Sequence, residues 1–541
     1  MTEEIYLGIS IDLPTAIARE AKAKFTDAEW AQDIPNYLLL RDDNQISIYF
    51  YQLDEDAKEW LHEQMKLAGH RASAGTIAAL RDAEKDPANS TIQSLMVLAQ
   101  VIGEFIKKEA IDGWIYSLGD DGEQFPWLVT NIVFQEESNA APCVAMHLVA
   151  NSATMSNDDY SRPSSKVAYF FASDIAGKKI ADVLAAKGFM KESPDLKRAY
   201  LESLESFVSY MPQTSQQFIA TGTVLEVSLA NPYKAPERLR LETPAKVIND
   251  EELIRRKFFT KADSPFWALQ NRDYSNIPMH PKVFCFNLET HTHMWIHVNN
   301  LTEYQYDPSL RDKLVLPQHH RDLIDILTQD MDVLMDDLIV GKSGGTTILC
   351  KGAPGLGKTL TAEVYSEVVG RPLYRVHSGQ LGIHSDTVEK NLEMILKRAQ
   401  RWGAVMLLDE ADVYIRKRGN DIDHNAVVAA FLRTLEYFHG LLFMTTNRSQ
   451  DVDDAIASRC IATIQYEPPT NDDAKQIWLV LSKQFEFLLS EKLVNELVEH
   501  FRDISGRDIK ELLKLTAKWC RQKHVEPTLD VFRACSQFRG L

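Results

Sequence analysis

The spacing of apolar residues in the first half of the chain predicts a mixture of helices and strands in no regular order. An amphipathic helix is predicted over residues 91–108, where apolar side chains recur every three or four positions. Short apolar runs predict strands at 166–171, 283–286 and 294–298, the last two as a pair. Another helix is expected from about Ile175. This half therefore indicates mixed α/β structure without an internal repeat.

From about residue 308 the pattern becomes regular. Residues 310–317 lead into an amphipathic helix predicted over 319–339, and strands and helices then alternate to about residue 467. Such alternation is typical of a parallel sheet with crossover helices. Beyond it the chain is predicted to be helical, because four residues that favour helix N-termini each precede a helical run: Thr470, Ser490, Ser505 and Thr528.

These changes in pattern predict four regions in a chain of 541 residues, which exceeds what one hydrophobic core usually organises. A stretch rich in Ser, Asn and Asp at 151–165 suggests the first boundary. The expected fold class is α/β, and its regions are an N-terminal α/β region (1–160), a second α+β region with a linker (161–307), a parallel-sheet unit (308–467) and a C-terminal helical unit (468–541).

Composition narrows the class of protein. No apolar run approaches the roughly 18 residues that a membrane span needs, and residues 1–4 lack the basic segment of a signal peptide. The six cysteines are scattered without C-x-x-C spacing, which indicates free thiols in a reducing cytoplasm. A net charge of −18 disfavours general binding to nucleic acid, although a local basic patch remains possible.

One octapeptide carries the most specific chemistry. It matches the pattern G-x-x-x-x-G-K-[ST] and lies between an apolar strand (346–350) and a helix that begins near Leu360. The residues of this phosphate-binding loop are Gly352, Ala353, Pro354, Gly355, Leu356, Gly357, Lys358 and Thr359. Leu360, the next residue, is also expected at the nucleotide. Glycines let the backbone N–H groups point at nucleotide phosphates, and the helix N-terminus adds partial positive charge. Lys358 is expected on the outer phosphates, and the Thr359 hydroxyl is expected to ligate Mg²⁺.

Two further apolar strands end in polar side chains that suit the same site. Residues 405–408 run into Asp409 and Glu410, and residues 440–446 end at Asn447. Asp409 is expected to hold Mg²⁺ through water, and Glu410 to activate the attacking water. Asn447 is expected to position that water.

Two arginines follow at positions where they could stabilise the negative charge that develops on a transferred phosphoryl group. Arg459 comes shortly after the strand that ends at Asn447, and Arg507 opens a predicted helix of the C-terminal unit. Either side chain by itself could equally be a solvated or ion-paired surface residue.

In this order the motifs resemble those of the AAA+ ATPases, over roughly residues 308–541. Residues 352–359 are similar to Walker A, residues 407–410 to Walker B, and Asn447, Arg459 and Arg507 to sensor 1, the arginine finger and sensor 2. The resemblance implies a P-loop NTPase core with a helical lid, with ATP and Mg²⁺ bound between them. It also implies a ring, commonly a hexamer, in which Arg459 acts on the nucleotide of a neighbouring subunit.

The resemblance further implies an ATPase that remodels or disassembles a protein client, which we expect the N-terminal half to recruit. Residues 382–386 lack the aromatic that many protein-threading members carry there, so threading through a pore is not predicted, although Ile383 and His384 could line a pore. The Ser-Arg-Cys segment around Arg459 also resembles clamp loaders. A nucleic-acid-linked ATPase of clamp-loader or helicase-loader type is therefore an alternative, and a nucleotide-gated scaffold is another.

Two other clusters are candidate binding sites. His291, His293 and His297 are expected on one face of a strand, where three imidazoles could bind zinc, although Trp295 shares that face. The basic run 416–418 could contact an acidic partner or nucleic acid, or could be a solvated loop.

Overall fold

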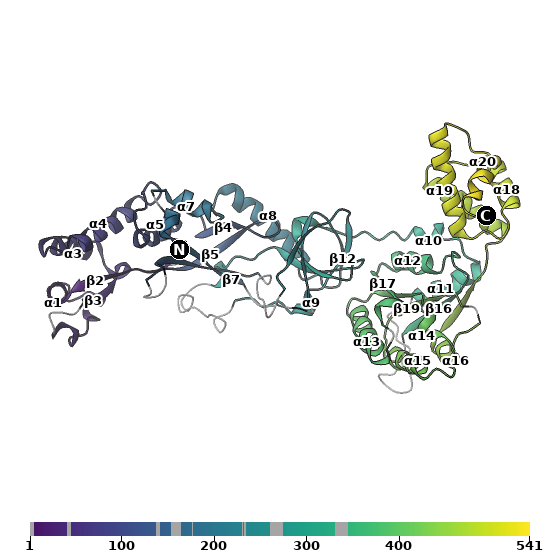
Figure 1. Cartoon of the computed structure of the whole chain (residues 1–541), viewed down its shortest axis with the longest axis horizontal. Helices are drawn as coiled ribbons and strands as arrows, with labels where there is room; N and C mark the ends of the chain where they lie inside the picture. Colours follow the sequence, from purple (N-terminus) through teal and green to yellow (C-terminus); the bar gives the residue numbers. More distant parts are fainter. Residues whose placement is uncertain are drawn as a thin grey trace.

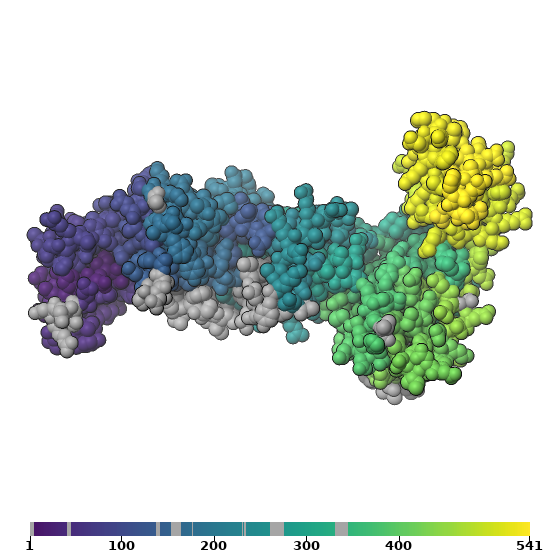
Figure 2. Space-filling view, in the orientation of Figure 1, coloured from purple at the N-terminus to yellow at the C-terminus, as the bar shows by residue number. Residues whose placement is uncertain are grey.

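The protein is an elongated row of units, shown here as a computed structural model (Figure 1). The structure describes residues 5–40, 45–136, 141–152, 164–175, 177–229, 231, 234–259, 274–329, 345–382, 384–448 and 450–541. The N-terminal half extends away from the C-terminal units, and the last helices form a separate body beside the green core (Figure 2). The first described strand, β1 (Tyr6–Gly8), pairs with β5 (Gln124–Gln135) within the row and does not lie at its tip.

The first unit is built on a six-stranded sheet in the order β7-β6-β5-β4-β8, with β1 pairing β5 in parallel. Its neighbouring strands along that order are antiparallel. Besides β5, the strands are β1 (Tyr6–Gly8), β4 (Trp114–Leu118), β6 (Cys143–Ala150), β7 (Ser164–Phe171) and β8 (Phe189–Lys191). An antiparallel pair of strands, β2 (Ser10–Pro14) and β3 (Gln45–Tyr49), lies at the tip, and helices α1 (Thr15–Lys24) and α2 (Glu29–Gln32) come between them in the chain.

The sheet continues across residue 160, since β6 pairs with β7 over eight residue pairs from Cys143–Phe171 to Ala150–Ser164. The predicted division between 160 and 161 therefore does not coincide with an edge of this sheet. A polar segment between two strands resembles a domain linker in sequence, although here it joins neighbouring strands of one sheet. Most of that segment, 153–163, lies outside the described residues.

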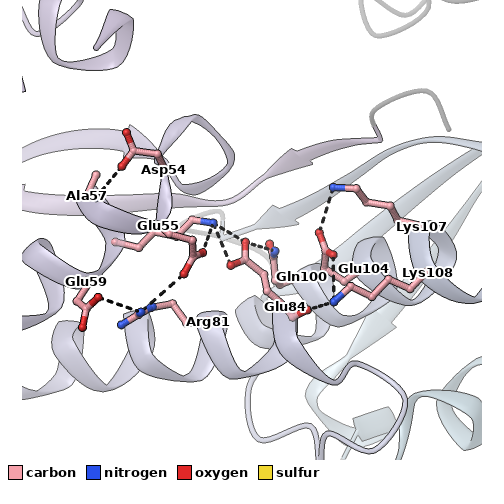
Figure 3. A network of polar contacts seen from close by, with 11 residues as sticks. Asp54, Glu55, Ala57, Glu59, Arg81, Glu84, Gln100, Glu104, Lys107 and Lys108 are labelled. Atoms are coloured by element: carbon pink, nitrogen blue, oxygen red, sulfur yellow. Dashed lines mark hydrogen bonds and ion pairs between the residues drawn. The ribbon is translucent and has the colours of Figure 1, made fainter. Parts of the chain in front are cut away.

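Three helices of the first unit are held together by a polar network (Figure 3). They are α3 (Glu55–Leu67), α4 (Arg71–Lys85) and α5 (Leu95–Glu109). Lys58 Nζ donates to Glu84 at 2.7 Å, and Gln100 Nε2 donates to the same carboxylate at 2.9 Å.

Helix α5 begins four residues later than predicted because the Ser94 side chain caps it by accepting the Val97 N–H. The helix expected from Ile175 is two short helices, α6 (Ala172–Ile175) and α7 (Ile180–Ala186).

The second unit is an antiparallel sheet of seven strands in the order β11-β10-β14-β13-β12-β9-β15. The pairing predicted for 283–286 with 294–298 is confirmed, because Val283–Phe286 lies opposite His293–Ile296. Helices α8 (Pro194–Tyr210) and α9 (Glu251–Ile254) accompany the sheet. Its strands are β9 (Gln217–Ala220), β10 (Thr223–Val227), β11 (Glu237–Arg240), β12 (Ala245–Asn249), β13 (Lys282–Asn287), β14 (His293–His297) and β15 (Leu301–Glu303).

The third unit is the parallel α/β core that the sequence predicts. Its five strands follow the order β17-β18-β19-β16-β20 and all neighbours are parallel. They are β16 (Thr346–Gly352), β17 (Leu373–His377), β18 (Val405–Asp409), β19 (Leu441–Thr446) and β20 (Ala462–Tyr466). The helices are α10 (Leu310–Lys313), α11 (Gln318–Gln329), α12 (Lys358–Val369), α13 (Ser385–Arg401), α14 (Asp412–Ile415), α15 (Ile422–Leu435) and α16 (Asp454–Arg459). The predicted helix 319–339 is described only to Gln329, and the rest lies outside the described residues.

The last unit is helical, as predicted. It comprises α17 (Asn471–Gln484), α18 (Glu491–His500), α19 (Gly506–Lys523) and α20 (Leu529–Gln537). The side chains of Thr470, Ser490 and Ser505 accept backbone N–H groups as N-caps. Thr528 occupies the fourth N-cap position without such a bond. Trp478 and Phe532 are buried in its core.

The second sheet packs directly against the parallel core, and the two share one hydrophobic cluster. Ile248, Phe286 and Leu288 from the sheet lie in the same buried cluster as residues of β18 and α13. At its edge Asp250, fully buried, accepts bonds from the Arg401 guanidinium at 2.7 Å and from Trp402 Nε1 at 2.8 Å. Because a buried carboxylate is costly unless paired, this contact fixes the sheet on the end of α13.

Candidate functional site

The phosphate-binding loop joins the end of β16 to the start of α12, as its sequence requires. Gly352 has φ +150°, and a Cβ atom there would lie 2.4 Å from the Tyr466 carbonyl oxygen. Gly357, in the left-handed region at φ +97°, precedes the first residue of α12. Both positions therefore demand glycine, and the loop ends on the N-terminus of a twelve-residue helix.

Lys358 is the most tightly held side chain of the loop. Its ammonium donates to the carbonyl oxygens of Gly352 at 2.8 Å and Ala353 at 2.7 Å, and to Asn447 Oδ1 at 3.0 Å. Burial lowers the pKa of Lys358 from its ordinary value. The sequence predicts that Lys358 and Asn447 share a site, and the structure brings them into direct contact.

The strand order explains how distant residues meet. Strand β19 lies between β16 and β18, so the carboxyl ends that carry the phosphate-binding loop, Asn447 and Asp409 are neighbours. Asp409 Oδ1 accepts the Thr359 hydroxyl at 3.0 Å and the Thr445 hydroxyl at 2.6 Å. The second oxygen, Oδ2, accepts Arg375 Nη2 at 2.6 Å. Burial by itself would raise the pKa of Asp409, but these donors outweigh it and hold the pKa below its ordinary value.

Thr359 and Asp409 fit a magnesium ion by their chemistry. A hydroxyl and a carboxylate oxygen 3.0 Å apart are the hard oxygen donors that Mg²⁺ prefers. Thr359 directly follows Lys358 in α12, Asp409 ends β18, and both line the cavity beside the loop. The pair is therefore the part of the site that could hold the ion.

Glu410 directly follows β18 in a backbone conformation that few residues other than glycine adopt, at φ +55°. Its N–H donates to Thr445 Oγ1 at 3.0 Å, which helps to hold this conformation. The residue is exposed and lines the cavity beside the phosphate-binding loop. Such local strain next to a cleft is frequent at functional sites.

The cavity itself lies between the parallel core and the helical unit, with a volume of about 2010 Å³. The helical unit closes on the loop, because the Arg507 N–H donates to the Gly355 carbonyl at 3.1 Å. The predicted site residues that line the cavity are Pro354, Gly355, Leu356, Gly357, Lys358, Thr359, Leu360, Asp409, Glu410, Asn447 and Arg507. Gly352 and Ala353 contribute through the carbonyl groups that hold Lys358.

Arg459 is the one predicted site residue that the structure does not bring to this cavity. It ends α16 and is exposed, with Nη2 3.8 Å from Glu436. Its side chain therefore lies on the surface, away from the cavity of its own chain.

Three residues of the site were missed by sequence reasoning. Thr445 holds Asp409, and Asp412 accepts the Asn447 N–H at 3.2 Å and the Thr446 hydroxyl. Asp412 belongs to the same Asp-Glu-Ala-Asp segment as Asp409, which was a usable signal. Arg375 gave no signal, because its contact depends on β17 lying next to β18.

The other two candidate clusters have structural roles. His293 stacks on Phe284 and bonds Asp250, whereas His291 lies outside the strand at φ +59°. Within the described ranges no group of three or more His, Cys, Asp or Glu residues could hold a metal ion, so the zinc alternative is not supported. In the basic run, Arg418 is bound by the buried Asp453 at 2.8 Å. Of the two residues named as able to line a pore, Ile383 lies outside the described residues.

No helix in the described part of the chain is long and apolar enough to cross a bilayer. The six cysteines are all free thiols, and five of them are buried.

Comparison with known proteins places the parallel core in a family. Residues 348–468 match the family model for the ATPase family associated with various cellular activities (AAA). A putative 26S proteasome regulatory subunit homolog from Methanothermobacter thermautotrophicus is 30% identical over 184 residues, 31% of this chain and 48% of that protein. Human Fidgetin-like protein 1 is 26% identical over 210 residues, 36% of this chain and 30% of that protein. This chain thus aligns with less than half the length of these relatives.

A chain in the structure of the Escherichia coli MS115-1 HORMA:CdnC:Trip13 complex aligns with 43% of this chain and 92% of its own length, at 18% identity and a TM-score of 0.36.

The match to the AAA family model covers the strands that carry the phosphate-binding loop, Asp409 and Asn447. The C-terminal part of this chain is therefore an AAA+ ATPase domain, with a parallel P-loop core.

Proposed function

We propose that the protein is a Mg²⁺-dependent ATPase that hydrolyses ATP to ADP and phosphate and uses the cycle to remodel or disassemble a protein client. The observation that carries this proposal is the meeting of Lys358, Asp409 and Asn447 at one edge of the parallel sheet, within a cavity closed by the helical unit. Lys358 follows the loop after β16, Asp409 ends β18 and Asn447 follows β19, so three neighbouring strands bring these groups together where a nucleotide could bind.

The residues have distinct roles in the proposed reaction. Lys358 exchanges its present carbonyl partners for the outer phosphates of ATP, where its charge stabilises the transition state. Thr359 and Asp409 hold Mg²⁺, which neutralises phosphate charge when bound. Glu410 orients and deprotonates the attacking water, and Asn447 fixes that water's position. Arg507, from the helical unit, reports the state of the γ-phosphate.

Arg459 supports an assembly of several subunits. Because its side chain faces away from its own cavity, it suits the nucleotide of a neighbouring subunit in a ring, which we propose to be a hexamer by family resemblance. There its guanidinium would stabilise charge on the transferred phosphoryl group.

A protein client is preferred over nucleic acid on three grounds. The net charge of −18 repels a polyanion, and one cation of the basic run is already paired with Asp453. A relative is also named as a proteasome regulatory subunit homolog. We propose that the units before residue 308 recruit the client and that the protein acts in the cytoplasm.

The test uses two substitutions in the full chain. Glu410→Gln is expected to bind ATP as the wild type does but to release phosphate at least roughly a hundredfold more slowly, because it removes the base. Lys358→Ala is expected to lose ATP binding. Binding is measured with a fluorescent ATP analogue and turnover by phosphate release.

Asp423→Asn, an exposed position near the start of α15, is the matched control and should behave as wild type. Wild-type turnover by Glu410→Gln would refute the assigned base. Stimulation of hydrolysis by DNA or RNA that disappears with salt would favour the nucleic-acid-linked alternative.

A further inference from the structure

Arg375 lies on the floor of the nucleotide cavity between two carboxylates. Its Nη2 is 2.6 Å from Asp409 Oδ2, and its Nη1 is 3.6 Å from Glu363 Oε1. All three residues line the cavity, and they come from β17, β18 and α12. One guanidinium therefore reaches two acceptors, of which Asp409 is the closer.

The contact occupies one of the two Asp409 oxygens that a metal ion, or a water bound to it, could use. Oδ1 already accepts the hydroxyls of Thr359 and Thr445. Oδ2 is the remaining oxygen, and Arg375 covers it. A magnesium ion, or a water bound to it, that approaches Asp409 through Oδ2 would compete with the guanidinium.

Glu363 provides a second place for the guanidinium. Burial raises the pKa of Glu363 above its ordinary value, while Arg375 opposes that shift, so the carboxylate lacks full compensation for its charge. Moving Arg375 from Asp409 to Glu363 would keep its positive charge paired throughout. Such an exchange requires two negatively charged acceptors within reach of one guanidinium, and Asp409 and Glu363 meet this requirement.

The backbone of β17 is fixed, which leaves only the side chain to move. Tyr374 and Val376, on either side of Arg375, are fully buried, and the Tyr374 hydroxyl accepts Arg398 Nη1 at 2.9 Å. The Arg375 side chain is 40% exposed. A long side chain on a rigid strand, open to the cavity, can change partners without a change of fold.

We propose that Arg375 is a positioning residue that holds Asp409 in the absence of Mg²⁺ and moves to Glu363 when Mg²⁺ and nucleotide enter. Arg375 thereby sets the Mg²⁺ concentration at which nucleotide binds tightly. The inference rests on the proposed function, in which Thr359 and Asp409 hold the metal.

The experiment measures binding of a fluorescent non-hydrolysable ATP analogue to the full chain while Mg²⁺ is titrated, and again in EDTA. Arg375→Ala should lower the Mg²⁺ concentration at half-maximal binding by roughly fivefold, the size expected of a partly exposed ion pair. Affinity in EDTA separates this effect from loss of positive charge near the phosphates, which would weaken binding with and without Mg²⁺ alike.

A second variant predicts the opposite shift. Glu363→Gln removes the alternative partner and should raise the half-maximal Mg²⁺ concentration, whereas the double variant should match Arg375→Ala. Arg371→Ala is the matched control, because Arg371 lines the same cavity but donates to the Gly403 carbonyl. It should leave the Mg²⁺ midpoint unchanged.

The outcomes separate the two proposals. A wild-type protein that binds no nucleotide, or binds it equally in EDTA, would refute the proposed function and this inference with it. Mg²⁺-dependent binding with a wild-type midpoint for both Arg375→Ala and Glu363→Gln would overturn the inference alone.

Discussion

At the scale of single residues, pairing with a buried carboxylate determines which arginines can still contact another molecule. Asp453 is 3% exposed and accepts Arg418 through Nε at 2.8 Å and through its backbone N–H at 3.3 Å. Arg418 therefore stabilises the loop after α14 instead of projecting freely toward a partner. The Arg459 guanidinium lies 3.8 Å from Glu436 and donates to the Ala455 carbonyl at 3.4 Å, and such long contacts on an exposed side chain are easily exchanged.

We expect Arg459→Ala to bind ATP normally and to lose most hydrolysis, because in the proposed ring its charge would act at the nucleotide of a neighbouring subunit. Mixing it with Lys358→Ala subunits should restore part of the activity, since the intact Arg459 of one subunit then faces the intact phosphate-binding loop of the other. Phosphate release by the mixture, compared with each variant alone, measures this. A mixture no more active than the sum of its parts would show that Arg459 does not act between subunits.

At the scale of elements, order along a sheet or packing of helices brings together residues that the sequence keeps apart. The insertion of β19 between β16 and β18 places Asn447 beside Lys358. In the first unit, α3, α4 and α5 meet at Glu84, whose carboxylate accepts Lys58 and Gln100 (Figure 3). Burial raises the pKa of Glu84, although Lys58 opposes the shift.

Lys58→Met is expected to destabilise these helices by about 3 kcal/mol, because it leaves the Glu84 charge buried without its partner. The double variant Lys58→Met, Glu84→Gln should be more stable than Lys58→Met alone, since no uncompensated charge remains. Hydrogen exchange of α4 and α5 amides gives the free energy of opening. Equal exchange in the single and double variants would contradict a role for the pair.

At the scale of the whole molecule, two charged junctions join the row of units. Between the second sheet and the parallel core, Asp250 binds Arg401, Trp402 and His293. Between the first and second units, Lys282 pairs with Asp121 at 2.8 Å, and both are almost fully buried. These buried charged contacts tie the second unit to both of its neighbours.

Asp250→Asn should loosen the first of these junctions by about 3 kcal/mol, because it removes the buried partner of Arg401. We expect faster hydrogen exchange in β12 and at the end of α13, with the phosphate-binding loop unaffected. Glu242→Gln, an exposed carboxylate on the same unit, is the control. Unchanged exchange on both sides of the junction would refute this role.

The junction near Lys282 is expected to weaken in acid. Burial lowers the pKa of His297 to about 4, with Asp121 opposing and Lys282 adding to the shift. In the unfolded chain the pKa of a histidine is about 6.5, so below that pH the unfolded form binds a proton at His297 that the folded form does not bind. The free energy of unfolding therefore falls as pH drops toward 4, by about 1.4 kcal/mol per pH unit. His297→Gln should flatten this dependence in hydrogen exchange of β13 and β14, whereas His70→Gln, at an exposed site, should not.

The sequence by itself determined the local chemistry of this protein. Its informative patterns are local: the glycine spacing of 352–359, the apolar strands that end at Asp409 and Asn447, and the helix caps at Thr470, Ser490 and Ser505. The P-loop core and the resemblance to the AAA family follow from the first two, and the helical C-terminal unit follows from the caps. Local periodicity could not reveal that β6 and β7 belong to one sheet, because pairing between strands depends on contacts far apart in the chain. Only the tertiary structure placed Arg375 on Asp409, Asp453 on Arg418 and Asp250 on Arg401, since the partner of a buried charge is set by which elements pack together.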